Sequence, residues 1–373
     1  MLLAPSVRSS IGPDDPTFEV TAKRGIAHVY NLEFEDAERD FAELTRMQPA
    51  HPAGYFFLAM VDWWRILIDL DDESRDQRFF DALDRVVDMC DSMLEKNGND
   101  VSAMFFKGGA LGFQGRLKFH RNDYLAAANA GRKALPLVQT AFSVDPHNYD
   151  ILLGTGIYNY YADVIPSEYP FVRPLLLFVP SGDKKKGIDQ LMQAAEKGKF
   201  ASTEAAYFLM QIYYFYEREY DKSLLLALDL TRKYPNNMLF QRYLGRSYAA
   251  MSNWTMTEEV FSEVVTRCRK QLRGFTGQVE REAQYYLGLA VMTTARLDEA
   301  LSHFYRCDEL SRGLDKSEVS GYMVMANLKI GNVYDLQRKR ELAVMQYNKV
   351  LNMKDYKESV SLARQYIKTR YSR

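Results

Sequence analysis

The chain has 373 residues, a net charge of −1 and three cysteines. Because the charge is close to zero, no overall basic field exists, and nucleic acid is not an electrostatically obvious partner. No apolar run approaches the ~18 residues that a membrane-spanning helix needs. Cys90, Cys268 and Cys307 fall far apart at apolar positions of expected helices. We therefore expect buried free thiols, with a Cys268–Cys307 disulfide as the alternative in an exported protein.

The N-terminal residues 1–16 are polar and are expected to form a disordered lead-in. The alternative is that residues 1–10, MLLAPSVRSS, are the remnant of a truncated signal peptide. The first interpretation predicts a cytoplasmic protein, and the alternative predicts export to the periplasm or cell envelope. Helix signals begin near Phe18.

A spacing motif recurs along the chain. An alanine lies twelve residues after a glycine, and an aromatic residue lies sixteen residues after it. The three copies are Gly288/Ala300/Phe304, Gly25/Ala37/Phe41 and Gly331/Ala343/Tyr347. Two helices joined by a short turn explain this spacing, because the small residues allow close approach and the aromatic ring fills the wedge between the helices. Three copies at identical offsets indicate an internal repeat.

Eight repeat units follow in chain order, each made of two helices. The first four are expected at about 18–49, from Pro52 to about 97, from about 101 to 146 and from about 149 to 195. The fifth is expected at 203–235, the sixth is centred on Leu244-Gly245, the seventh on Leu287–Cys307, and the eighth runs from 320 to about 353, followed by a last helix. The predicted fold is all-α: a right-handed α-solenoid of about eight helix–turn–helix repeats with a C-terminal capping helix. It is expected to occupy residues 17–373 as a single domain, with irregular, extended repeats at about 52–200 and regular repeats at about 201–353.

The small residue, alanine, aromatic and junction proline of these units resemble the tetratricopeptide repeat, which has a period of about 34 residues. The resemblance covers residues 17–373, and the second to fourth units depart from it through long helices and inserts. The middle of the chain, from Gly154 through the Ser181-Gly182-Asp183 cap to the TEAAYFLMQIYY stretch at 203–214, is similar to the tetratricopeptide repeat protein 39 family. The whole chain also resembles bacterial tetratricopeptide proteins of unassigned function. The resemblance implies a protein-binding scaffold without catalytic residues.

No motif predicts catalysis, a cofactor or a metal. Gly182–Gly187 has the spacing of a phosphate-binding loop, but Ile188 and Asp189 stand where lysine and serine or threonine are needed, so we interpret it as a helix cap. The five histidines are scattered without metal-ligand spacing. An enzyme is the third hypothesis, with Asp163, Glu168 and His120 as its candidate residues.

The function hypothesis is a non-enzymatic scaffold that binds a peptide or protein segment in the concave groove formed by the first helices of the repeats. The predicted partner-binding residues are Phe56, Trp63, Trp64, Arg65, Lys107, Phe113, Arg116, Tyr158, Asn159, Phe215, Arg242 and Arg246. The alternative for the aromatic members is that they belong to the core. The alternative function is a small-molecule or lipid carrier with a pocket under the proline-rich apolar link, residues 166–180.

Overall fold

The computed structural model describes residues 12–372 except residues 14, 172, 174–179 and 317. The whole possible signal-peptide remnant, residues 1–10, and parts of the predicted lead-in and of the apolar link therefore lie outside the described residues. The described elements are all helical, and the chain divides into two compact units, residues 1–212 and 213–373. The predicted single solenoid over 17–373 stays a prediction, whereas the helical-repeat architecture is confirmed within each unit.

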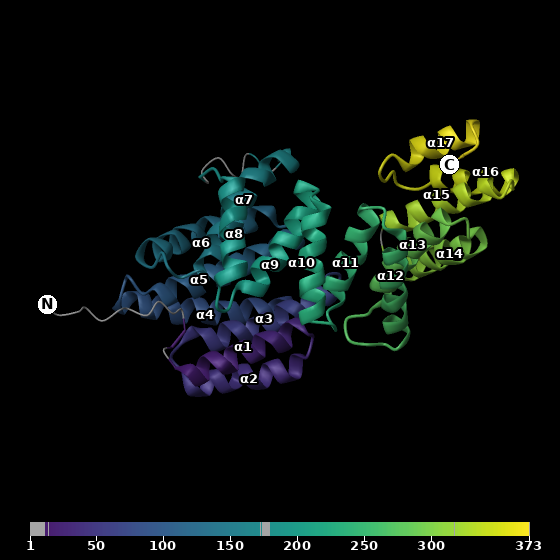
Figure 1. Cartoon of the computed structure of the whole chain (residues 1–373). Helices are drawn as coiled ribbons and strands as arrows, with labels where there is room; N and C mark the ends of the chain where they lie inside the picture. Colours follow the sequence, from purple (N-terminus) through teal and green to yellow (C-terminus); the bar gives the residue numbers. More distant parts are fainter. Residues whose placement is uncertain (1–11, 14, 172, 174–179, 317, 373) are drawn as a thin grey trace. The chain divides into compact units, whose positions relative to one another are not determined.

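The first unit is formed by four pairs of helices and one further helix (Figure 1). They are α1 (Pro16–Tyr30), α2 (Phe34–Met47), α3 (Pro52–Ile68), α4 (Asp76–Lys96), α5 (Val101–His120), α6 (Tyr124–Val144), α7 (Ile151–Glu168), α8 (Lys184–Lys197) and α9 (Ser202–Ile212). Each helix packs against the next one in the chain. Helix α7 continues past Pro166 for two residues, and α8 begins after Asp183, whose side chain caps the N–H of Lys186. The helix-cap interpretation of this segment is therefore confirmed.

The second unit begins with one turn of π-helix, Tyr213–Glu217, and continues with helices alone. They are α10 (Tyr220–Lys233), α11 (Met238–Ala250), α12 (Trp254–Arg269), α13 (Gly277–Thr293), α14 (Leu297–Leu314), α15 (Gly321–Leu336), α16 (Arg340–Leu351) and α17 (Ser359–Lys368). The first helices of three successive pairs, α11, α13 and α15, lie next to one another. They form one continuous face, which is developed below as the functional site.

The glycine–aromatic wedge predicted from the spacing motif is confirmed in both units. A Cβ atom added to Gly25 would lie 2.4 Å from the ring of Phe41, and one added to Gly288 would lie 2.6 Å from that of Phe304. Gly331 faces Tyr347 in the same way, and the rings of Phe41, Phe304 and Tyr347 are fully buried. Glycine is required at these positions because the aromatic ring occupies the space of a side chain.

The three cysteines are free and buried, as expected from their apolar positions. Burial raises the pKa of each thiol to about 12, so all three are protonated and unreactive at neutral pH. Over the described ranges, none of the helices has the length and apolar character required to cross a bilayer.

We expect Gly288→Ala to lower the free energy of unfolding of the second unit by about 2 kcal/mol, because the new methyl group overlaps the buried ring of Phe304. Gly313→Ala is the matched control in the neighbouring helix, since a Cβ there meets no atom within 4 Å. The control is expected to be neutral or to stabilise by up to about 1 kcal/mol through helix propensity. Denaturant titration of both variants tests this. An equal effect at the two glycines would contradict the wedge.

Candidate functional site

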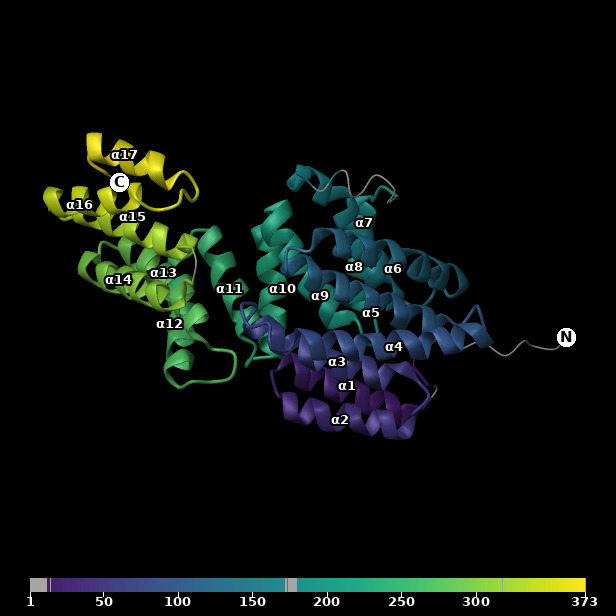
Figure 2. The same ribbon diagram turned by 180° about the vertical axis from the view of Figure 1, so that it is seen from behind.

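In the first unit, the face shared by α1, α3 and α5 is covered by α9, which lies beside α5 in both views (Figure 1, Figure 2). The ring of Trp64 lies 5.6 Å from that of Tyr207. The guanidinium of Arg116 lies 4.8 Å from the ring centre of Trp63 and 4.4 Å from that of Phe208. This face is therefore used for contacts within the unit.

A buried polar contact fixes α9 in this place. The hydroxyl of Tyr30 donates a hydrogen bond of 2.8 Å to one carboxylate oxygen of Glu204, and Arg116 donates one of 3.0 Å to the other. The side chain of Glu204 is only 7% exposed. Because charge-assisted hydrogen bonds in a buried place are strong, this cluster joins α1, α5 and α9, which are far apart in the sequence.

The predicted aromatic anchors of the first unit lie in its core. Trp63 is 0% exposed, Trp64 2% and Phe56 8%. Phe113 is half-buried, with its ring 6.0 Å from that of Phe56 and 5.6 Å from that of Trp63. These contacts favour the core interpretation of these side chains over the groove interpretation.

The predicted polar residues of the first unit also have partners within the chain. Arg65 pairs with Glu38 at 2.5 Å and lies 3.7 Å from Asp62. Lys107 pairs with Asp91. Tyr158 donates to the carbonyl of Pro180, and the amide of Asn159 donates to Gln190 at 2.7 Å. The charges of this unit that the sequence analysis singled out are therefore already compensated.

The pH dependence of the first unit can be predicted from His51, the N-cap of α3. Its Nδ1 accepts the N–H of Ala53, and its Nε2 lies 3.0 Å from the hydroxyl of Ser102. Burial lowers the pKa of His51 to about 4. An unfolded histidine has a pKa near 6.5, so between about pH 6.5 and 4 the unfolded state binds more protons. Stability contributed by His51 is thus present above pH 6.5 and is lost as the pH falls toward 4.

We expect His51→Asn to retain the cap, since asparagine is a favoured N-cap residue, and to lose less stability than the wild type between pH 7 and pH 5. Urea titrations at the two pH values measure this difference. His147→Asn is a suitable control, because His147 is exposed. An unchanged pH dependence in His51→Asn would contradict a neutral buried imidazole.

In the second unit, a buried carboxylate lies between two arginines. Glu282 on α13 is 0% exposed and accepts hydrogen bonds from Arg242, at 2.6 and 3.0 Å, and from Arg246, at 2.5 Å. Both arginines come from α11, one helical turn apart, so they lie on one face of that helix. The sequence analysis predicted both arginines but not the glutamate that holds them.

Tyrosines surround this cluster. Tyr286 and Tyr322 come from α13 and α15, and burial raises the pKa of both hydroxyls, so both are neutral donors at physiological pH. The guanidinium of Arg246 lies 5.5 Å from the ring centre of Tyr243. The ring of Phe215 lies 5.9 Å from that of Tyr243 and is 52% exposed. We call the face carrying Arg242, Arg246, Glu282, Tyr286 and Tyr322 the inner face of the second unit.

The charges of the inner face do not balance. Burial alone would raise the pKa of Glu282, but the two arginine charges outweigh it and lower the pKa to about 2. One carboxylate therefore faces two guanidinium groups, which leaves one positive charge. Lys329 of α15 lies seven residues after Tyr322, on the same side of the helix, and is half-buried. Burial lowers its pKa.

Sequence analysis missed Glu282, the tyrosines and Lys329. One signal could have identified Tyr286 and Lys329: Gly245, Gly288 and Gly331 are 43 residues apart, and in this register Tyr243, Tyr286 and Lys329 occupy equivalent positions. Lys329 is thus a lysine at a position where the two preceding repeats have tyrosine.

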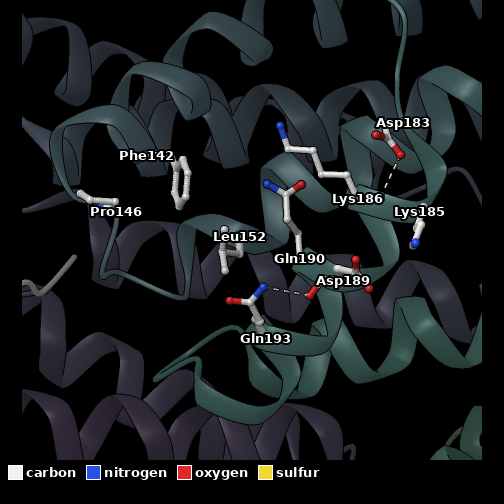
Figure 3. A pocket seen from close by; sticks show the side chains of 9 residues that line it. All are labelled: Phe142, Pro146, Leu152, Asp183, Lys185, Lys186, Asp189, Gln190 and Gln193. Carbon is white, nitrogen blue, oxygen red and sulfur yellow. Dashed lines mark hydrogen bonds between the residues drawn. The ribbon is translucent and has the colours of Figure 1, made fainter.

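A cavity of about 400 Å³ lies at the start of α8 (Figure 3). Phe142 and Pro146 lie on one side of it and the side chains of α8 on the other. The lining residues are Phe142, Pro146, Leu152, Asp183, Lys185, Lys186, Asp189, Gln190 and Gln193. Most of them are polar or charged, which does not suit a lipid. The link residues 172 and 174–179, which were predicted to cover a carrier pocket, lie outside the described part of the chain.

The cavity and the inner face do not form a metal site. In the ranges that the structure describes, no group of three or more histidine, cysteine, aspartate or glutamate side chains is placed to hold a metal ion. The buried tyrosines and the arginine-bound Glu282 are held in single protonation states at neutral pH. The chemistry that this arrangement offers is recognition by hydrogen bonds, charge and aromatic contact.

The family comparison agrees with a helical-repeat fold. Residues 23–61 match the family model of the tetratricopeptide repeat. The chain is similar to human IFIT1 dimers with m7Gppp-AAAA (12% identity, 96% of this chain and 89% of that one, TM-score 0.45) and with PPP-AAAA (11%, 96% and 86%, 0.43). It is also similar to a tetratricopeptide repeat protein from Parabacteroides merdae (14%, 84% and 99%, 0.34). No curated protein matches the sequence.

Proposed function

Because the chain is a tetratricopeptide repeat protein, we propose that it is a non-enzymatic scaffold and that the inner face of the second unit binds a peptide or protein segment. Such repeats are generally protein-interaction scaffolds. The observation that supports this assignment is a contrast between the two units. The corresponding face of the first unit is covered by α9, whereas the inner face of the second unit carries aromatic and arginine side chains next to the exposed ring of Phe215.

The chemistry of this face suits a polypeptide. Tyrosine and arginine are enriched among the residues that dominate binding energy at protein interfaces. Glu282 holds the two guanidinium groups in place, so little side-chain freedom is lost on binding. Hydrogen bonds join the hydroxyl of Tyr322 to Glu282 and that of Tyr286 to Tyr214, so both rings are held in place beside the guanidinium groups.

Phe215→Ala is expected to weaken binding of a peptide segment about tenfold, because an exposed aromatic ring at the edge of the face supplies a large apolar contact. Peptides for the measurement are first selected with the full-length protein from a phage-displayed random library, and affinities are then measured by fluorescence anisotropy. Met345→Ala is the matched control: Met345 on α16 is 64% exposed and lies on a second helix of its pair. Equal affinities of Phe215→Ala and the wild type would contradict the proposal.

A further inference from the structure

Helix α10 has an exposed apolar side opposite to its buried one. Ser223, Ala227 and Leu230 are buried, and α10 packs against α11. Leu225 and Leu228 are 67% and 41% exposed. Because an α-helix has about 3.6 residues per turn, these two leucines lie on the side of α10 that points away from the three buried residues. Solvent therefore reaches apolar side chains on the two central turns of this helix.

Leucine at both positions is unusual among the repeats. In the register of the spacing motif, Leu225 and Leu228 lie fourteen and seventeen residues after Gln211, which takes the place of the glycine. The residues at the same offsets from the glycines of other units are Arg39 and Ala42 in α2, Glu259 and Ser262 in α12, Ser302 and Tyr305 in α14, and Met345 and Asn348 in α16. Two exposed leucines one turn apart are therefore a property of α10 rather than of the repeat.

Charged residues of opposite sign flank the two leucines at equal distances. Asp221 lies four residues before Leu225, and Arg232 lies four residues after Leu228. The resulting spacing of four, three and four residues is that of the contact positions in a coiled coil. Read in the opposite direction, the order acid, leucine, leucine, base becomes base, leucine, leucine, acid. We call these four residues the α10 stripe.

Both charges of the α10 stripe are available for a contact between molecules. The carboxylate of Asp221 has neither a hydrogen bond nor an ion pair with any residue that the structure describes. The side chain of Arg232 is 80% exposed and shares the carboxylate of Asp229 with Lys233, each at a distance of 2.7 Å. Because Lys233 compensates Asp229 by itself, Arg232 can pair with another carboxylate without leaving a charge unmatched.

We propose that the α10 stripe pairs with the α10 stripe of a second copy of this chain, with the two helices antiparallel about a twofold axis. Leu225 of each copy packs against Leu228 of the other, and Asp221 of each copy pairs with Arg232 of the other. A twofold interface requires a surface that is complementary to itself, and the α10 stripe has this property. An unrelated partner would not require an acid and a base at equal distances from the two leucines, which favours a second copy over another protein.

The expected dimer is weak. Each α10 has 14 residues and is about 21 Å long, so the contact lies at the low end of the size range of specific interfaces. We therefore expect a Kd of about 10–100 µM. This pairing is independent of the proposed function, because no residue of the α10 stripe belongs to the inner face.

Sedimentation velocity of the full-length protein, between about 5 and 300 µM, measures the dimer. Leu225→Glu is expected to raise Kd at least tenfold, because it replaces an apolar contact by a carboxylate at both ends of the twofold pair. Leu125→Glu is the matched control, since Leu125 on α6 is 66% exposed and lies outside the α10 stripe. The control should have the Kd of the wild type.

An exchange of charges tests the antiparallel register. Asp221→Arg and Arg232→Asp should each raise Kd about tenfold, because each places like charges opposite each other twice. An equimolar mixture of the two variants should form a heterodimer with about the affinity of the wild-type dimer, since each base of one chain then faces an acid of the other. Arg39→Asp, at an exposed arginine that also pairs with an acid three residues away, is the matched control and should have no effect.

Circular dichroism verifies that each variant is folded. A wild-type protein that stays monomeric over the whole concentration range would overturn the proposal, and so would a dimer whose Kd is unchanged by Leu225→Glu. Absence of recovery in the mixture of Asp221→Arg and Arg232→Asp would overturn the antiparallel register and, with it, the proposal. Peptide binding at the inner face is measured separately, so each of these outcomes leaves the proposed function standing.

Discussion

Replacement of Glu282 by alanine is expected to lower the free energy of unfolding of the second unit by about 3–4 kcal/mol. Removal of one partner from a buried ion pair leaves an uncompensated charge, and the loss is typically of this size. Removal of the Glu282 side chain leaves Arg242 and Arg246 facing each other without their shared carboxylate. Their side chains are 20% and 14% exposed. Glu282→Gln should be intermediate, because the amide oxygen still accepts hydrogen bonds but carries no charge.

Hydrogen exchange of the full-length protein, measured separately for the segments of α11 and α13, reports this loss for the second unit alone. Glu263→Ala is the matched control, since Glu263 is 54% exposed and pairs with Arg267 one turn away on α12. An exposed pair of this kind is worth less than about 1 kcal/mol. If the two variants had equal effects, Glu282 would not organise the inner face, and the pre-arranged arginines of the proposed site would lose their basis.

The second large effect is expected in the first unit. Trp63→Ala should lower its free energy of unfolding by about 4 kcal/mol, because it empties a large volume in a core that cannot collapse completely. The indole is 0% exposed and packs 5.7 Å from the ring of Phe79 and 5.6 Å from that of Phe113. Leu125→Ala on α6, where the side chain is 66% exposed, should be nearly neutral.

Trp63→Phe distinguishes the effect of lost side-chain volume from that of the unsatisfied indole N–H. The indole Nε1 is buried without a hydrogen-bond partner among the described residues, so phenylalanine removes an unsatisfied donor together with some volume. A smaller loss, about 1 kcal/mol, is expected. The free energy of unfolding of both variants is measured by denaturant titration, with hydrogen exchange of α3 and α5 as the probe. A stable Trp63→Ala protein that no longer binds the selected peptides would contradict the core assignment and restore Trp63 as a binding residue.

The repeat architecture could be predicted because its signals are local. Gly288 and Phe304 are sixteen residues apart, and a two-helix hairpin necessarily brings them together. The N-cap Asp183 and the start of α3 at Pro52 are local for the same reason. These features can be predicted without knowing how the rest of the chain folds.

The candidate site could be predicted only in part, because helical spacing assigns a residue to a face without showing what covers that face. Trp64 was predicted on the inner side of α3, and the ring that covers it, Tyr207 on α9, comes from more than a hundred residues later in the chain. The partner of Arg116 is likewise distant, since it pairs with Glu204. The 43-residue register marks the position of Lys329 in the sequence, but its lack of a partner among the described residues is visible only in the three-dimensional arrangement.

The account depends on the location of the binding face. Hydrogen–deuterium exchange of the full-length protein with and without a saturating selected peptide tests it most directly, since exchange is resolved segment by segment. We predict added protection in α11, α13 and α15, around Arg246, Tyr286 and Lys329, with the first unit unchanged. Protection confined to α3 and α5, or to the cavity at the start of α8, would contradict the assignment of function to the inner face of the second unit.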